Sequence, residues 1–122
     1  MYEIYVQTEI STAHRLRDHP GPCRNLHGHN WTIEIRVGCE RLNDQGMGID
    51  FAVLKDHLAE ICGRLDHVEL NGILFFSENN PTAENLARYI FVELDNRLEG
   101  EDAGLISVEV NETPGSGVVY RG

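Results

Sequence analysis

The stretch HGHNWTIEIRV, residues 27–37, decides the fold of this chain, because apolar and polar side chains alternate along it. The apolar positions are Trp31, Ile33, Ile35 and Val37. Such alternation is typical of a β-strand with one buried face. Residues two apart share a face of a strand, so we expect His27 and His29 to point the same way as the apolar row. Their separation of about 7 Å along a strand allows two imidazoles to converge on one metal ion.

A second alternating stretch, residues 2–14, ends in another histidine, His14. If the two strands pair as a hairpin through the loop 15–26, His14 and His27 meet at the loop end. Three histidines and an open position are typical of a catalytic zinc site. The alternative is that the His-x-His pair consists of partly buried, hydrogen-bonded histidines without a metal. The third histidine favours the zinc hypothesis, with His14, His27 and His29 as ligands.

Cys23 lies in the loop between the two predicted strands, beside the candidate ligands. The chain has three cysteines, which cannot all pair within it, and cytosolic cysteines more often bind metals, act in catalysis or are buried. Cys23 is therefore either a fourth ligand that closes a structural zinc site or a reactive thiol beside an open one. We expect Cys62 to be a small core residue on a helix, and we assign no role to Cys39.

The composition fits a single domain over residues 1–122, with a formal net charge of −10. Proteins that bind nucleic acids carry basic patches, so this charge argues against nucleic acid as a partner. No stretch is long and apolar enough to span a membrane, and the amino terminus lacks a signal-peptide pattern, so we expect a cytoplasmic protein. Arg15, Arg17 and Arg24 cluster near the histidines, where they form either a solvated loop or an anion site beside the metal.

The remaining pattern predicts two helices and two further strands. The first helix begins after Asp50, a good N-cap, and its apolar stripe runs from Phe51 to Leu65. The second begins with Pro81 at its first helical position. The further strands are expected at residues 105–113 and 117–121. The expected fold is α+β: a four-stranded antiparallel sheet with two helices on one face, in the order ββααββ. Its open edges predict self-association.

Two places in the second half of the chain carry further candidate groups. Asp66 and His67 follow the first predicted helix, as either an exposed helix end or a pair in which the carboxylate orients the imidazole. One face of the predicted third strand carries Ile106, Val108, Val110 and Glu112. Because burial of an unpaired acid is costly, Glu112 either lies at the solvated strand end or binds adjacent N–H donors, as on a pterin or guanine edge.

Together these motifs resemble the pyruvoyl-tetrahydropterin synthase family, which has the tunnelling fold. The resemblance covers almost the whole chain and rests on the order and spacing of its elements. They are AHRL (13–16), CxxxHGH (23–29), GxGIDF (46–51), LDHxxLN (65–71), NPTxE (80–84), ET (112–113) and YRG (120–122). Three residues separate Cys23 from His27, as in the bacterial 6-carboxytetrahydropterin synthases of queuosine biosynthesis, whereas the animal enzymes have five.

The resemblance implies a role for each candidate residue. The three histidines, His14, His27 and His29, would bind zinc, and Cys23 would be the catalytic base rather than a ligand. Asp66 and His67 would form a proton relay. Glu112 would anchor the pterin ring, and Thr82 and Thr113 match positions near the pterin pocket.

The resemblance also implies a reaction and an assembly. The chain would be a lyase that converts 7,8-dihydroneopterin triphosphate to 6-carboxy-5,6,7,8-tetrahydropterin, acetaldehyde and triphosphate. Two trimers would stack into a homohexamer with active sites at subunit interfaces. The first alternative is a 6-pyruvoyl-tetrahydropterin synthase, in which triphosphate elimination is the outcome. The second is a non-catalytic zinc domain in which Cys23 closes the metal site.

Overall fold

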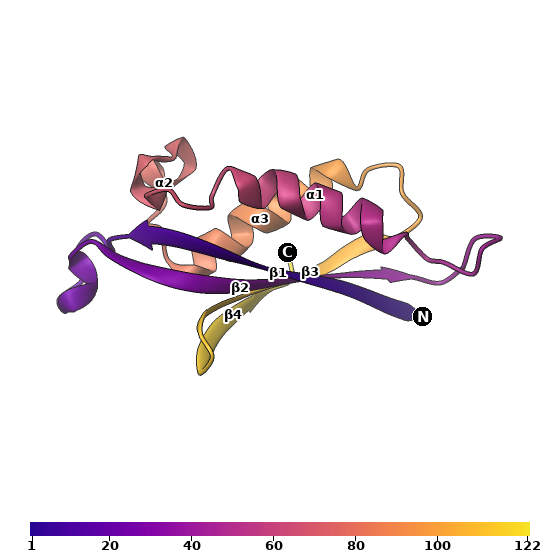
Figure 1. The fold of residues 1–122 in the computed structure, drawn as a ribbon, viewed down its shortest axis with the longest axis horizontal. Coiled ribbons are helices and arrows are strands. Elements are labelled where there is room, and N and C mark those ends of the chain that lie inside the picture. The colour runs from indigo at the N-terminus through magenta and orange to yellow at the C-terminus, as the bar shows by residue number, and fades with distance from the viewer.

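A computed structural model describes all residues, 1–122, and contains one four-stranded antiparallel sheet in the order β1-β2-β3-β4. The strands are β1 (Tyr2–His14), β2 (His27–Cys39), β3 (Gly104–Thr113) and β4 (Ser116–Tyr120). The helices are α1 (Phe51–Gly63), α2 (Leu74–Glu78) and α3 (Ala83–Arg97), with two 3-10 turns, η1 (Pro22–Arg24) and η2 (Leu70–Gly72). The helices lie on one side of the sheet (Figure 1). The predicted fold is confirmed, with α2 as a short additional helix.

The pairing of β1 with β2 brings the end of β1 next to the start of β2, as expected from the hairpin. The register runs without a break from Tyr2 opposite Cys39 to His14 opposite His27. The hairpin therefore closes through the loop 15–26, and two of the three candidate ligands face each other where that loop begins and ends.

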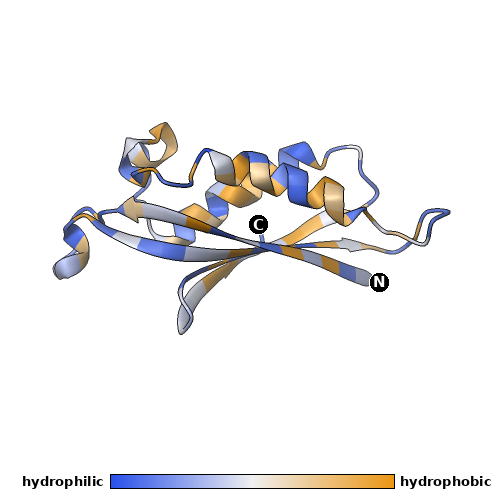
Figure 2. Ribbon diagram, viewed as in Figure 1, coloured by the Kyte–Doolittle hydropathy of each residue, from blue (hydrophilic) through white to orange (hydrophobic).

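The core lies between the sheet and the helices. The apolar row of β2, from Trp31 to Val37, is 0% exposed. The apolar faces of α1 and α3 cover it, and Figure 2 shows hydrophobic residues on the sides of these helices that face the sheet. The buried helix residues include Leu54, Leu58, Ile61, Leu86, Ile90 and Leu94. Each such side chain stabilises the fold by about 1.5–3 kcal/mol relative to leaving it in water, so this row fixes the sheet face on which the histidines lie.

The starts of the two long helices agree only in part with prediction. Asp50 is the N-cap of α1, as expected, and its carboxylate accepts a hydrogen bond from the Ala52 amide at 2.8 Å. Phe51 was expected in the buried stripe, which is wrong: it is 58% exposed. Pro81 was expected at the first helical position, which is also wrong. Thr82 is the N-cap, because its hydroxyl accepts from the Asn85 amide at 3.1 Å, so α3 begins at Ala83.

A β-bulge overturns the expected position of Ile106. Leu105 pairs with Val37 and Ser107 with Arg36, so Ile106 is an extra residue on β3. Because the side-chain period of a strand is two, one extra residue reverses the facing of everything before it. Leu105 therefore packs against the core in place of Ile106. Glu112 lies beyond this bulge, at a second register shift between Asn111 and Thr113, and it keeps its predicted face, because its carboxylate reaches His29.

The two outer strands of the sheet, β1 and β4, each have a neighbouring strand on one side only. The chain covers one end of the β1 edge itself: the Ala13 amide donates to the Val68 carbonyl at 3.1 Å, and Ala13 forms an isolated parallel bridge with Glu69. This contact attaches the segment after α1 to the end of β1, next to His14. None of the helices has the length and apolar character needed to cross a membrane.

Candidate metal and catalytic site

The three predicted ligand histidines form one cluster where β1 ends and β2 begins. One nitrogen from each of His14, His27 and His29 lies within 4.8 Å of the other two. The ring centroids are 4.5 Å apart for His14 and His27, 4.8 Å for His27 and His29, and 5.1 Å for His14 and His29. Strand pairing brings the first pair together, and the two-residue period of β2 adds the third. The cluster could hold a metal ion.

Backbone carbonyls orient two of these rings. His14 Nδ1 lies 2.7 Å from the Pro81 carbonyl oxygen, and His27 Nδ1 lies 2.7 Å from the Asn25 carbonyl oxygen. A carbonyl oxygen only accepts, so each Nδ1 carries the proton and donates it. The Nε2 atom of each ring then has a free lone pair. This arrangement, with one ring nitrogen donating to a carbonyl and the other free, is typical of metal-binding histidines.

The buried nitrogens of the cluster indicate that it is built for a ligand. His14 is 1% exposed, and burial lowers its pKa below 6.5. Nε2 of His14 and Nε2 of His29 are buried without a hydrogen-bond partner. Buried polar atoms are rarely left unpaired, because an unpaired one costs roughly 1–3 kcal/mol. Neutral imidazoles with free nitrogens are good ligands for zinc, so the residues present fit a three-histidine site with an open position.

Glu112 lies at the margin of the histidine cluster. Its Oε1 atom is 3.2 Å from His29 Nε2, an ion-pair distance, although the angles do not form a hydrogen bond. The carboxyl group is partly exposed. The structure thus brings together four of the predicted site residues, the three histidines and this glutamate.

Cys23 lies outside the group of clustered ligand atoms. It sits in η1, with a free and half-buried thiol. Its carbonyl accepts a hydrogen bond from the Leu16 amide at 2.8 Å, which ties η1 to the chain that leaves β1. The geometry therefore favours a site of three histidines over one closed by the cysteine.

The side chains of Asp66 and His67 lie within ion-pair distance of each other at the edge of β1. His67 Nδ1 lies 2.9 Å from Asp66 Oδ1, and the Ser11 amide donates to the same oxygen at 2.8 Å. The amide hydrogen bond is the main cause that lowers the pKa of Asp66, and the His67 ring adds to it. His67 has a left-handed φ of 59° and its side chain is 80% exposed. The imidazole is therefore oriented by the carboxylate and open to whatever approaches this edge.

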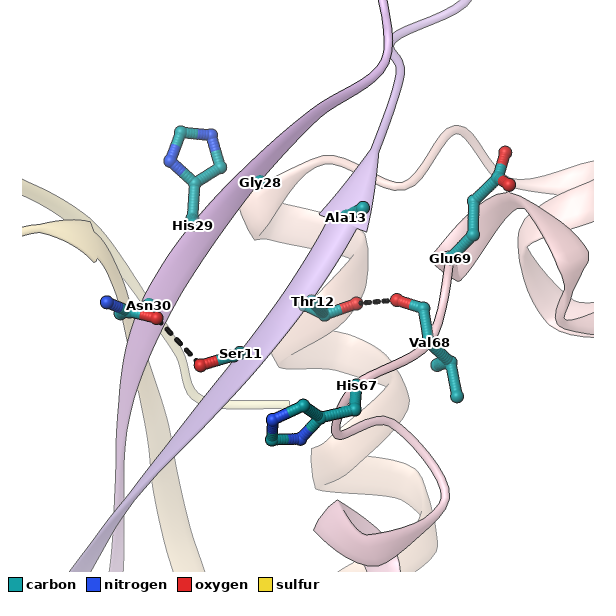
Figure 3. Close-up of a pocket in the computed structure, with 9 residues that line it drawn as sticks. All are labelled: Ser11, Thr12, Ala13, Gly28, His29, Asn30, His67, Val68 and Glu69. Carbon is teal, nitrogen blue, oxygen red and sulfur yellow. Dashed lines mark hydrogen bonds between the residues drawn. The ribbon is translucent and has the colours of Figure 1, made fainter.

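A hollow of about 480 Å³ adjoins both the histidine cluster and the Asp66–His67 pair, since His29 and His67 both line it. Figure 3 shows β1 running between the two rings. Two hydrogen bonds shape its wall: Ser11 Oγ donates to Asn30 Oδ1 at 2.7 Å, and Thr12 Oγ1 donates to the Val68 carbonyl at 2.6 Å (Figure 3). Ser11 and Asn30 alternate with the ligand histidines, so the hollow extends onto the other face of the sheet.

The two predicted substrate threonines are engaged in local structure. The Thr82 hydroxyl caps α3. The Thr113 hydroxyl lies 2.9 Å from Ser116 Oγ and accepts from the Gly115 amide in the turn between β3 and β4. Substrate binding by either residue stays a prediction.

Of the three arginines that the sequence places near the site, Arg17 makes a specific side-chain contact. The Arg17 guanidinium donates to the Phe76 carbonyl at 2.8 Å, so this residue holds the loop against α2. Arg15, Arg17 and Arg24 are all exposed. An anion site formed by these side chains stays a prediction.

Sequence reasoning missed the groups that hold the site in place. They are the carbonyls of Asn25 and Pro81, described above, and the side chains of Asn71 and Asn80. No sequence pattern marks a backbone carbonyl as a histidine partner. The two asparagines do stand within quoted motifs: Asn71 is the last residue of LDHxxLN, and Asn80 is the first residue of NPTxE. A polar amide at the end or the start of a motif is the signal that could have found them.

Comparison with known proteins gives a family. The family model described as 6-pyruvoyl tetrahydropterin synthase matches residues 3–122. The 6-carboxy-5,6,7,8-tetrahydropterin synthase of Synechocystis sp. is 40% identical, covering 98% of this chain and 93% of the relative. The enzyme of the same name from Bacillus subtilis is 34% identical, covering 98% of this chain and 85% of the relative.

A solved structure agrees with this result. The 6-pyruvoyl tetrahydropterin synthase of Caenorhabditis elegans superposes with a TM-score of 0.89 at 27% identity, covering 99% of this chain and 95% of the other. The chain belongs to the 6-pyruvoyl tetrahydropterin synthase family, and its fold is the tunnelling fold expected from the resemblance.

Proposed function

We propose that this protein is a zinc-dependent 6-carboxytetrahydropterin synthase of queuosine biosynthesis. It would convert 7,8-dihydroneopterin triphosphate and water to 6-carboxy-5,6,7,8-tetrahydropterin, acetaldehyde and triphosphate. The observation that carries the proposal is the histidine cluster with its free, buried Nε2 atoms. The choice of product is supported by the names of the Synechocystis and Bacillus relatives and by the short spacing between Cys23 and His27.

The three histidines would hold the metal through their Nε2 atoms. Bound there, zinc supplies Lewis acidity, which lowers the pKa of hydroxyl groups and of adjacent carbon acids in the substrate side chain. The protein's part is to aim the imidazoles. The Pro81 and Asn25 carbonyls do this for His14 and His27 by accepting hydrogen bonds from Nδ1, which leaves Nε2 as the free nitrogen. Burial, by contrast, is what lowers the pKa of His14 and disfavours its charged form.

Cys23 would be the base that takes a proton from the substrate side chain. Its thiol is free and half-buried in a loop adjoining the histidine strands, and it is not among the clustered ligand atoms. His67 would carry the proton onward, with its ring oriented by Asp66. A positioned acid–base group of this kind contributes roughly a hundred- to ten-thousand-fold in rate.

Glu112 would bind the pterin ring through N–H donors on the edge of the heterocycle. Its carboxylate offers two acceptor oxygens and lies beside the metal ligands, so a ring held there would place its side chain toward the histidines. Thr82 and Thr113 would form further parts of this pocket.

We further propose a homohexamer of two trimers in the cytoplasm. The outer strands β1 and β4 each have one free edge, which a second copy of the chain can pair with. His67 is highly exposed, as a group completing a neighbour's site would be. The three cysteines are unpaired, which is typical of proteins in a reducing compartment.

The direct test is to incubate the zinc-loaded protein with 7,8-dihydroneopterin triphosphate and identify the products by mass. The proposal expects 6-carboxytetrahydropterin together with acetaldehyde. A pyruvoyl product without acetaldehyde would instead establish the alternative that the family name and the Caenorhabditis neighbour support. No turnover of any pterin, with the zinc retained, would favour a non-catalytic zinc domain.

A further inference from the structure

The loop 15–26 carries Cys23, and its first residues are held by two asparagine side chains from distant segments. Asn71 accepts the Arg15 amide on Oδ1 at 2.9 Å and donates from Nδ2 to the Arg15 carbonyl at 3.1 Å. Asn80 does the same for Arg17, at 2.9 Å and 3.2 Å. Each side-chain amide therefore forms hydrogen bonds with both the backbone N–H and the backbone C=O of one residue, as a neighbouring β-strand would.

The residue between the two held arginines is attached to Cys23. The Leu16 amide donates to the Cys23 carbonyl at 2.8 Å. Arg15 and Arg17 are fixed on either side, so Leu16 has little freedom, and the backbone of Cys23 is fixed with it. The Arg17 guanidinium adds a third bond at that residue, to the Phe76 carbonyl at 2.8 Å.

Both asparagines stand on segments that already belong to the site. Asn71 lies in η2, a few residues after the Asp66–His67 pair. Asn80 precedes Pro81, whose carbonyl orients His14. The Asn80 carbonyl itself accepts from the Thr82 amide at 2.7 Å and from the Asn85 side chain at 2.9 Å, so it is fixed to the start of α3.

We propose that Asn71 and Asn80 are positioning residues that together hold Cys23 in register with the metal-binding histidines. The two side chains, named here the asparagine clamp, do not touch the reacting atoms. They act by fixing Arg15 and Arg17, and through Leu16 the cysteine. The catalytic consequence rests on the proposed function, in which Cys23 is the base, whereas the physical hold on the loop does not.

The test uses the zinc-loaded protein and three alanine variants, Asn71→Ala, Asn80→Ala and Asn43→Ala. Asn43 is the matched control, because its side chain also accepts two backbone amides, from Gln45 and Met47, in a turn outside the site. The first readout is the rate at which iodoacetamide alkylates Cys23. That rate is specific, since Cys39 and Cys62 are buried. The second is amide hydrogen exchange of Leu16.

Loss of either clamp residue is expected to raise both the alkylation rate and the exchange rate by severalfold, while Asn43→Ala leaves them unchanged. Turnover should fall about 10- to 100-fold, because a displacement of about 1 Å at a reacting group has an effect of that size. KM should change little, since neither side chain contacts the substrate, and the zinc content should stay constant. Asn71→Asp keeps the bond from the Arg15 amide and should recover part of the loss.

Three results would overturn the proposal: alkylation and exchange unchanged in both clamp variants, the same change in Asn43→Ala, or loss of zinc. Where an alanine variant does not fold, Asn71→Asp and Asn80→Asp replace it, since each removes one of the two bonds without a change of size. The proposed role of Cys23 is tested separately. If Cys23→Ala keeps full turnover, that role is wrong, and the alkylation and exchange rates still decide whether the clamp holds the loop.

Discussion

His14 Nδ1 lies 2.7 Å from the carbonyl oxygen of Pro81, a residue 67 positions further along the chain. This hydrogen bond joins the end of β1 to the residue before the N-cap of α3. It keeps the imidazole in one tautomer and aims Nε2 at the other two histidines. The orientation of the candidate metal site therefore depends on how the helical layer packs on the sheet.

Metal content should depend on each histidine of the cluster. We expect His27→Ala to lose bound zinc, whereas His57→Ala, on α1, keeps one zinc per chain by elemental analysis. Removing the metal from the parent protein should lower its Tm, because a ligand present at about 100 times its Kd stabilises by about 2.7 kcal/mol. The protein should stay folded by circular dichroism, since the core of 23 buried residues does not include the histidines. Complete unfolding on chelation would favour a structural zinc domain.

The metal-free protein should lose stability as the pH falls below about 6.5, and His14 should be one cause. Burial lowers the pKa of His14 in the folded chain, so the unfolded chain, with an ordinary pKa of 6.5, binds the proton first. Above that pH the imidazole is neutral in both states and its contribution is fully present. Below it, the free energy of unfolding declines until the folded pKa is passed.

The ring resonances of the metal-free protein measure this pKa by nuclear magnetic resonance, with the His14 signal assigned from a His14→Asn spectrum. A titration midpoint at or above 6.5 would contradict the expected effect of burial.

Cys23 should be needed for turnover and dispensable for the metal. We expect Cys23→Ala to reduce kcat by a hundredfold or more, the range typical of losing a positioned base, with zinc content unchanged. Cys62→Ala serves as the comparison, because burial raises the pKa of that thiol to about 12 and keeps it out of proton transfer at neutral pH. Loss of zinc in Cys23→Ala would identify the thiol as a ligand instead.

Thr82 should contribute to stability through its cap. Thr82→Ala removes the hydroxyl that accepts from the Asn85 amide, which we expect to cost about 1 kcal/mol in the free energy of unfolding, measured by urea denaturation. Thr82→Ser keeps the cap and should be close to the parent. If Thr82→Ala also raises KM for the pterin while Thr82→Ser does not, the hydroxyl contributes to substrate binding as well.

Much of the fold could be predicted from the sequence, because alternation and helical spacing are local. The alternating residues of β1 and β2 defined the strands, and the pairing of His14 with His27 followed from a hairpin through the loop 15–26. Asp50 could be identified as an N-cap because its side chain accepts a hydrogen bond from a backbone amide in the first turn of the helix that follows. Ile106 was misplaced, since a β-bulge arises from the pairing with β2 and leaves no mark in the β3 sequence.

The candidate site, like the fold, has some features that local sequence sets and others that depend on tertiary packing. The sequence alone determined which side chains meet at one end of the hairpin, because strand period and strand pairing set the positions of three histidines, and the motifs around them identified the family. Only the tertiary structure decided how His14 is aimed and how the cysteine loop is held. The partners responsible, the Pro81 carbonyl and the amides of Asn71 and Asn80, come from segments more than 50 residues away. Helix packing brings them to the site, and no local pattern encodes it.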